Sequence, residues 1–175
     1  AYNAMPGPEL ESAVIPYVDQ VLLPGITQHV ERAVIHSGDS VAISPPRSLS
    51  PEMTAHVADC SRRLALALGT RGLVNIQYLI YEGKLYVIEV NPRSSRTVPY
   101  LSQVTGVHMV DLPTRVLMGP SLAPLRSPHG LPPPPPFSLV TAPVFSCVQL
   151  HDPHPLPRPH PTSSLPPSAL LPPPQ

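Results

Sequence analysis

Few aromatic or charged residues occur in this sequence. Tryptophan is absent, phenylalanine occurs twice and tyrosine six times, so a hydrophobic core must be built mainly from aliphatic side chains. The 11 Lys and Arg residues balance the 11 Asp and Glu residues, and a formal net charge of zero gives no electrostatic reason to expect binding to nucleic acid or to an anionic membrane. We therefore expect neither of these among the partners of the protein.

Cysteine and long apolar runs are also scarce. Cys60 and Cys147 are too few for a disulfide framework, which is typical of a reducing compartment. No apolar run is long enough to span a bilayer, and the first residues lack the pattern of a signal peptide. Together these features predict a cytoplasmic protein.

Proline is abundant instead, and its distribution divides the chain. Of the 175 residues 29 are proline, and they are concentrated after Gly119 in runs such as 132–136 and 172–174. Proline has no backbone donor and fixes φ, so such a stretch is expected neither to pair in a sheet nor to continue a helix. The sequence thus predicts a folded unit over residues 1–119 and a disordered or polyproline II tail over residues 120–175.

Residues 75–91 have the composition of a β-hairpin. Segments 75–81 and 85–91 are rich in β-branched, aromatic and aliphatic residues, and Glu82-Gly83-Lys84 between them predicts a three-residue turn. In a register centred on Gly83, Gln77 faces Glu89 and Tyr81 faces Leu85. A register shifted by one residue would separate Gln77 from Glu89, so this pairing is expected to depend on the three-residue turn.

The alternation of side chains along the two strands then predicts one polar and one apolar face. The face that carries the polar residues comprises Gln77, Leu79, Val87, Glu89 and Asn91, and the opposite face comprises Ile76, Tyr78, Ile80, Tyr86, Ile88 and Val90. One face is therefore expected to be a core, while the other carries a polar cluster at one end.

Gln77, Glu89 and Asn91 form that polar cluster. One carboxylate beside two amide side chains can coordinate a divalent ion that also binds nucleotide phosphates. A solvated sheet edge is the alternative, but Arg93 and Arg96 follow directly, and two forked donors three residues apart suit anionic oxygens. We expect a functional site here.

Two helices are predicted around the hairpin. Ser50 is a suitable cap for a helix that begins at Pro51 and ends near Gly69, with an apolar stripe formed by Met53, Val57, Cys60, Leu64 and Leu68. A second helix is expected over residues 107–118, with Val110, Leu112 and Val116-Leu117 as its apolar positions and with Pro113 tolerated only in the first turn. The predicted fold class is α+β, an antiparallel sheet with packed helices.

Two segments of the chain resemble the large subunit of carbamoyl phosphate synthetase. IEVNPRSSRTVPYLSQVTGV, residues 88–107, is similar to the metal-binding strand of that family and the loop after it, and HVERAVIHSGDS, residues 29–40, is similar to its nucleotide-binding segment. The separations of His36 from Gln77 and of Gln77 from Glu89 match the family without a gap. The resemblance covers residues 21–119, is closest to the second, carbamate-phosphorylating half, and implies part of an ATP-grasp domain.

The resemblance implies a role for each matching position. Gln77, Glu89 and Asn91 correspond to ligands of Mg²⁺ or Mn²⁺, and Gln77 and Glu89 also to ATP-binding residues. Arg93 and Arg96 correspond to arginines that neutralise the transferred phosphoryl group. The stretch lining the nucleotide corresponds to Val34, Ile35, His36 and Ser37. The implied reaction is ATP-dependent synthesis of carbamoyl phosphate, for pyrimidine and arginine synthesis, by attack of a carbamate oxygen on the γ-phosphate.

Two departures from the family pattern carry expectations. Valine at position 34 replaces the usual glycine, and if the position needs a positive φ, the loop is strained and ATP affinity is lowered, so that Val34→Gly should strengthen binding. The lid loop of the family has no counterpart in the sequence. We therefore expect half of an active site and little or no synthetase turnover by the isolated chain.

The resemblance also implies partners, and alternatives stay open. The implied partner is a glutamine-hydrolysing small subunit or domain that supplies ammonia, and the implied substrates are bicarbonate or carbamate and ammonia. One alternative is a different ATP-grasp ligase, such as a biotin-dependent carboxylase. Another is a non-catalytic, vestigial ATP-grasp protein that acts through its proline-rich tail as a ligand for proline-binding modules.

Overall fold

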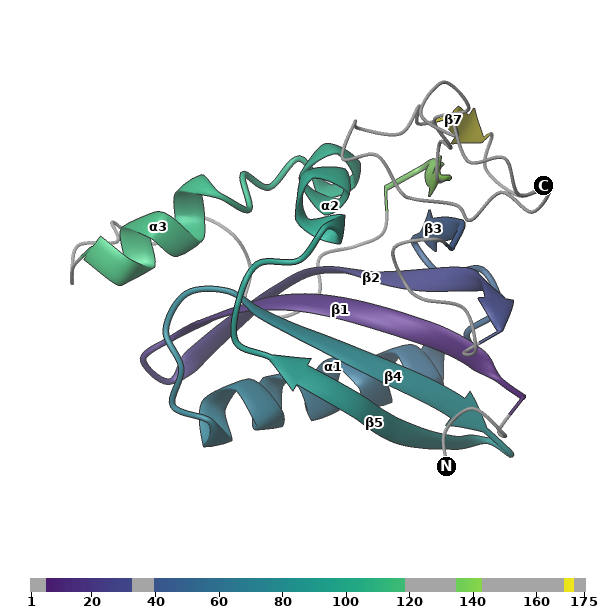
Figure 1. Cartoon of the computed structure of the whole chain (residues 1–175), viewed down its shortest axis with the longest axis horizontal. Coiled ribbons are helices and arrows are strands. Elements are labelled where there is room, and N and C mark those ends of the chain that lie inside the picture. The colour runs from purple at the N-terminus through teal and green to yellow at the C-terminus, as the bar shows by residue number, and fades with distance from the viewer. Residues whose placement is uncertain (1–5, 33–39, 119–134, 143–168, 172–175) are drawn as a thin grey trace, which may run out of the picture.

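An antiparallel sheet forms the centre of the fold (Figure 1). The computed structural model describes residues 6–32, 40–118, 135–142 and 169–171. The elements within these ranges are, in chain order, β1 (Pro8–Tyr17), β2 (Gln20–Arg32), β3 (Ala42–Ser44), α1 (Pro51–Ala67), β4 (Val74–Tyr81), β5 (Lys84–Asn91), α2 (Thr97–Thr105), α3 (Asp111–Met118), β6 (Ser138–Thr141) and β7 (Ala169–Leu171). Among the described residues the strands lie side by side in the order β5-β4-β1-β2-β3-β6-β7.

Helices cover both faces of this sheet, because β1 contributes alternate residues to two separate cores. Leu10 and Val14 pack with Val57 and Ala65 of α1, whereas Ala13 and Ile15 pack with residues of α2 and α3. Successive side chains of a strand point to opposite faces, so α1 lies on one side of the sheet and α2 and α3 lie on the other (Figure 1). The α+β class, with an antiparallel sheet and packed helices, is confirmed.

Helix α1 begins where the sequence predicts, but its buried residues agree only in part with the predicted apolar stripe. The Ser50 hydroxyl oxygen accepts a hydrogen bond from the Met53 amide at 3.2 Å, Pro51 occupies the first turn, and the helix ends at Ala67, shortly before Gly69. Its buried residues are Val57, Ser61 and Ala65. Leu68, expected to belong to the apolar stripe, is exposed because it follows the last helical turn.

The turn between β4 and β5 differs from the prediction. Glu82 and Gly83 alone form it, with φ values of 51° and 72°, as in the two-residue turns that join twisted antiparallel strands. Tyr81 therefore faces Lys84 rather than Leu85. A register shift between Tyr78–Val87 and Gln77–Glu89 leaves Ile88 as an extra residue on β5, and this bulge restores the pairing of Gln77 with Glu89.

The bulge also corrects the predicted assignment of side chains to faces. Val87 faces Tyr78 and joins the core beneath α1, although we predicted it on the polar face. Tyr86 faces Leu79, on the opposite side from Tyr78, so its predicted place on the apolar face is wrong as well. Both errors follow from a turn that is one residue shorter than expected, because a shift of one residue exchanges the two faces.

The region after β5 contains one helix that the sequence analysis did not predict and one that is shorter than predicted. Residues 97–105 form α2, where only a loop was expected, and α2 ends at Gly106 in the left-handed conformation with φ 68°. Helix α3 begins at Asp111, which places Pro113 in its first turn. Val110 and Leu117, expected to be core positions, are exposed.

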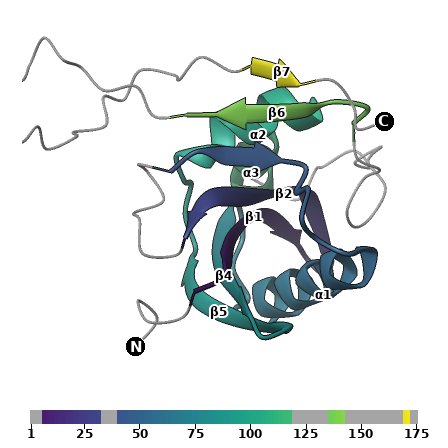
Figure 2. The same ribbon diagram turned by 90° about the vertical axis from the view of Figure 1, so that its right-hand side faces the viewer.

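Strands β6 and β7 fall within the predicted tail. Strand β6 pairs antiparallel with β3 on one side and with β7 on the other (Figure 2). Leu139 of β6 is buried in the core beside α2. For residues 138–141 the structure thus differs from the predicted disorder, because Ser-Leu-Val-Thr is free of proline and rich in β-forming residues. The boundary between residues 119 and 120 stays a prediction. Among the described residues, no helix is long and apolar enough to cross a membrane.

Candidate functional site

A row of polar side chains crosses four neighbouring strands on the face of the sheet opposite α1. Thr27 of β2 lies opposite Glu11 of β1, Glu11 lies opposite Gln77 of β4, and Gln77 lies opposite Glu89 of β5. Directly opposite residues of an antiparallel pair have Cβ atoms about 5 Å apart, so these side chains are neighbours. The structure therefore brings Gln77 and Glu89 together as the sequence predicts, and adds Glu11 to the same row.

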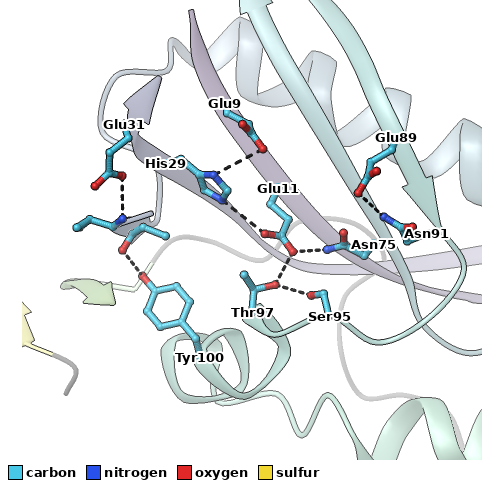
Figure 3. Close-up of polar contacts among 12 residues, drawn as sticks. Glu9, Glu11, His29, Glu31, Asn75, Glu89, Asn91, Ser95, Thr97 and Tyr100 are labelled. Atoms are coloured by element: carbon cyan, nitrogen blue, oxygen red, sulfur yellow. Dashed lines mark hydrogen bonds and ion pairs between the residues drawn. The ribbon is translucent and has the colours of Figure 1, made fainter. Parts of the chain in front are cut away.

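Asn91, the last residue of β5, lies next to this row. It pairs with Asn75 of β4, and its Nδ2 donates a hydrogen bond of 2.7 Å to Oε1 of Glu89 (Figure 3). The amide oxygen of Asn91 is not used in that bond. Glu89 is exposed while Gln77 and Asn91 are half-buried. The predicted polar set thus stands at the rim of the sheet, with a carboxylate open to solvent.

Residues 92–96, which we call the two-arginine loop, leave this rim directly after Asn91. The Arg93 amide donates to the Asn91 carbonyl at 2.8 Å, and the Arg93 Nη1 donates to the Ser94 carbonyl at 2.9 Å. Arg96 is the residue before the first turn of α2. Both arginine side chains are exposed. The structure therefore places Arg93 and Arg96 beside the strand that carries Glu89 and Asn91.

The residues predicted to line a nucleotide, Val34, Ile35, His36 and Ser37, lie outside the described residues. The chain on either side of them is held by Glu31, whose Oε2 accepts a hydrogen bond of 2.8 Å from the Val41 amide. The Val30 amide donates to the Val41 carbonyl, also at 2.8 Å. The expected strain at Val34 stays a prediction.

Glu11 is the centre of a buried hydrogen-bond network on the same face (Figure 3). Its Oε1 accepts hydrogen bonds from Nδ2 of Asn75 and from Oγ1 of Thr97, the latter at 2.7 Å. The Thr97 hydroxyl also lies 2.6 Å from the Ser95 hydroxyl. Glu11 is only 2% exposed, and a buried carboxylate is costly unless such partners satisfy it.

His29 of β2 lies between two buried carboxylates. Its Nε2 is 3.5 Å from Glu11 Oε2, and its Nδ1 is 3.7 Å from Glu9 Oε1. Neither ring nitrogen meets the geometry of a hydrogen bond.

The surroundings of Glu11 have opposing effects on its pKa. Burial raises the pKa, but the adjacent His29 and the hydrogen bonds from Thr97 and Asn75 lower it, and the net shift is downward. The network therefore favours the ionised carboxylate at neutral pH.

Glu9, Glu11 and His29 were not predicted as site residues from the sequence. The sequence does contain a signal for the two carboxylates, because Glu9 and Glu11 are two residues apart on an apolar strand and therefore share a face. Their proximity to Gln77 and Thr97 could not be predicted from the sequence, since it depends on β1 lying between β2 and β4.

The donor set at the rim suits a hard divalent cation. Among the described residues, no cluster of three or more His, Cys, Asp or Glu side chains could hold a metal ion alone. Gln77, Glu89 and Asn91 offer one carboxylate and two amide oxygens, so an ion there would need further oxygen ligands. Phosphates supply such oxygens, and Mg²⁺ is commonly held by one or two carboxylates together with the phosphates of a substrate.

Sequence comparison connects this site with one family. The family described as "Carbamoyl-phosphate synthase L chain, ATP binding domain" matches residues 21–125. The carbamoyl phosphate synthase large chains of Clostridium perfringens and Clostridium beijerinckii are 46% identical to this chain over 144 residues. The match covers 82% of this chain and 14% of each relative, so the chain spans about one seventh of their length.

Structural comparison agrees on the fold. A biotin carboxylase–β,γ-ATP complex from Campylobacter jejuni superposes with a TM-score of 0.66 at 18% identity, over 79% of this chain and 30% of that one. Pyruvate carboxylase of Rhizobium etli gives the same TM-score at 22% identity, over 82% of this chain and 14% of that one. At these identities the likeness shows the ATP-grasp fold alone. The family match and the identity to the clostridial proteins establish that this chain belongs to the carbamoyl-phosphate synthase large-chain family, within its ATP-binding domain.

Proposed function

We propose that this chain supplies the metal- and phosphate-binding side of an ATP site that serves carbamoyl phosphate synthesis. The observation that carries the proposal is the placement of Gln77 directly opposite Glu89, with Asn91 donating to Glu89 from the next position on that face. Three oxygen-bearing side chains thus lie at neighbouring positions on one face of the hairpin, where Glu89 is exposed. The family match to an ATP-binding domain supports ATP as the nucleotide.

Each group of residues has a separate role in this proposal. Gln77, Glu89 and Asn91 would hold Mg²⁺ or Mn²⁺, which when bound neutralises charge on the phosphates. Arg93 and Arg96 bind the oxygens of the transferred phosphoryl group, because exposed guanidinium groups can donate two hydrogen bonds each. Such a site acts mainly by positioning and by charge neutralisation.

The finer assignments are also part of the proposal. The phosphoryl acceptor is carbamate, as in the second half of the family's large chain, and the reaction belongs to a cytoplasmic ligase. A glutamine-hydrolysing small subunit or domain supplies the ammonia. The 46% identity to proteins named carbamoyl phosphate synthase large chain supports these assignments.

Calorimetric titration of Mg-ATP into the full chain tests the proposal. The wild-type chain should bind with a measurable heat, and Glu89→Ala should abolish that heat because the sole carboxylate of the set is removed. Glu82→Ala is the matched control. It removes an exposed glutamate from the same hairpin, at the opposite end of the strands, and should bind as the wild type does.

Two results would contradict the proposal. Equal binding by the wild type and Glu89→Ala would mean that ATP is held elsewhere. Absence of binding in both, with folding confirmed by circular dichroism, would mean that the site is vestigial. The alternative, a non-catalytic protein that acts through its proline-rich tail, would then be favoured.

A further inference from the structure

Glu11 joins four elements of the fold at one buried point. It belongs to β1, its Oε2 lies 3.5 Å from His29 of β2, and its Oε1 accepts hydrogen bonds from Asn75 of β4 and from Thr97 of α2. The two oxygens are thus divided between partners on opposite sides. Since each partner restricts the carboxylate in a different direction, Glu11 has one well-defined orientation.

The contact with Thr97 fixes the point at which α2 begins. Arg96, the residue before the helix, makes no side-chain cap hydrogen bond, so the first turn is not held in the usual way. An ionised carboxylate can only accept, so the Thr97 hydroxyl uses its single proton on Glu11. The Ser95 hydroxyl, 2.6 Å away, must then donate to Thr97. A directed chain of hydrogen bonds runs from Ser95 through Thr97 to Glu11.

The two-arginine loop is therefore held at both of its ends. At its start, the Arg93 amide donates to the carbonyl of Asn91, at the end of the proposed metal-binding strand. At its end, Thr97 is bound to Glu11 at the centre of the sheet. Arg93 and Arg96 lie between these two attachments. Movement of either attachment would change where their guanidinium groups stand relative to Glu89.

We propose that Glu11 is a positioning residue, which through Thr97 sets the two-arginine loop so that Arg93 and Arg96 reach a phosphoryl group bound beside Glu89. The proposal rests on the proposed function for the roles of the arginines. Glu11 itself is buried at 2% exposure and acts without touching the nucleotide.

The chemistry of the position supports a role beyond packing. Ala13 and Ile15, the next residues on the same face of β1, are apolar and fully buried in the core beneath α2 and α3. An apolar residue at position 11 would avoid the cost of burying a carboxylate, which is often not recovered by its partners. A carboxylate is nevertheless present where the loop carrying both arginines meets the sheet.

Thr97 is the appropriate residue to vary, because a change at Glu11 would also remove the acceptor of Asn75 and one of the two carboxylates beside His29, and its effect would not be specific to the loop. Thr97→Val keeps the shape of the side chain and removes the donor to Glu11, whereas Thr97→Ser keeps the donor. Amide hydrogen exchange of the full chain is measured first, without ligand. We expect exchange in residues 93–98 to be about tenfold faster in Thr97→Val and unchanged in Thr97→Ser, with α1 and β4 unaffected. Equal exchange in all three proteins would overturn the proposal.

Mg-ATP titration then tests whether the effect of Thr97 on nucleotide binding depends on Arg93 and Arg96. Thr97→Val should weaken binding about tenfold, Thr97→Ser should restore it, and Thr97→Val should add nothing in a chain that already carries Arg93→Ala and Arg96→Ala. A further tenfold loss in that background would overturn the proposal, because Thr97 would then act independently of the arginines. If the wild type binds no Mg-ATP, the proposed function fails, while the exchange measurement still decides whether Glu11 and Thr97 hold the loop.

Discussion

Gln77 lies directly opposite Glu89 because a bulge at Ile88 compensates for a turn of only two residues. Without the bulge, a regular ladder from the Glu82-Gly83 turn would place Gln77 opposite Ile88 and send Glu89 to the face beneath α1. Bulges reorient side chains at the rims of sheets in this way. The proposed metal site therefore depends on the combination of the turn and the bulge.

The backbone of Glu82 provides a first prediction. Its φ of 51° is left-handed, a conformation that costs an ordinary L-residue roughly 1 kcal/mol or more, whereas Asn tolerates it. Glu82→Asn should therefore raise the free energy of unfolding of the full chain by about 0.5–1 kcal/mol in urea titrations. Glu82→Ala, which removes the charge but keeps the strain, is the control. An equal gain from Ala would show that charge, and not the backbone, is responsible.

Glu11 should make stability depend on acidic pH. Its folded-state pKa is lowered from 4.5, so the stability it contributes is present above the unfolded-state value and is lost as the pH falls through the folded-state pKa. We expect the difference in unfolding free energy between wild type and Glu11→Gln to be largest near pH 7 and to shrink steadily below about pH 4.5. Urea titrations between pH 7 and pH 3 measure it. A difference that is constant with pH would contradict the shift.

Tyr78 should have the corresponding effect at alkaline pH. Burial raises its pKa well above the ordinary value, although the hydrogen bond with Ser61 at 2.6 Å lowers it somewhat. The neutral phenol therefore contributes stability that is fully present below the unfolded-state pKa of about 10 and is lost as the pH rises toward the folded-state pKa.

Tyr78→Phe tests this effect. The variant should be about 1 kcal/mol less stable at pH 7, because a buried hydrogen bond is lost, yet its stability should fall less steeply above pH 10. Tyr100→Phe is a matched variant, since burial also raises the pKa of Tyr100. Urea titrations between pH 8 and pH 11 compare the slopes. Slopes as steep as that of the wild type in both variants would contradict the prediction.

Ser50 should contribute to the stability of α1. Its hydroxyl accepts from the Met53 amide, which otherwise has no partner within the helix. Ser50→Ala should lower the unfolding free energy by about 1 kcal/mol, and Ser50→Asp, which retains an acceptor, should stay close to the wild type. Equal losses in both variants would show that the cap is not the cause. Chemical denaturation followed by circular dichroism provides the measurement.

Local signals in the sequence were sufficient for several parts of the fold. Ser50-Pro51 predicted the start of α1, because capping and the tolerance of proline in the first turn are properties of adjacent residues. The hairpin and the pairing of Gln77 with Glu89 were also predicted. That pairing does not arise from the predicted three-residue turn, however, because a two-residue turn with a bulge is present.

Other parts required contacts between distant residues. Helix α2 was not predicted, although four of its residues, Val98, Tyr100, Leu101 and Val104, are buried. Their packing partners are on β1, β2 and β6, and Pro99 weakens any local helix signal. Strand β6 was assigned to a tail for a related reason. Its pairing partner, Ala42–Ser44, precedes it by almost a hundred residues.

The sequence by itself determined the family, the antiparallel hairpin and the identities of the candidate ligands, because motif spacing, side-chain alternation and helix capping are local properties of the chain. Only the tertiary structure decided that Glu11 stands between His29, Asn75 and Thr97, and that the two-arginine loop is anchored to the middle of the sheet. The physical reason is that the order of strands places β1 between β2 and β4. Residues separated by 64 and by 86 positions thereby share one carboxylate.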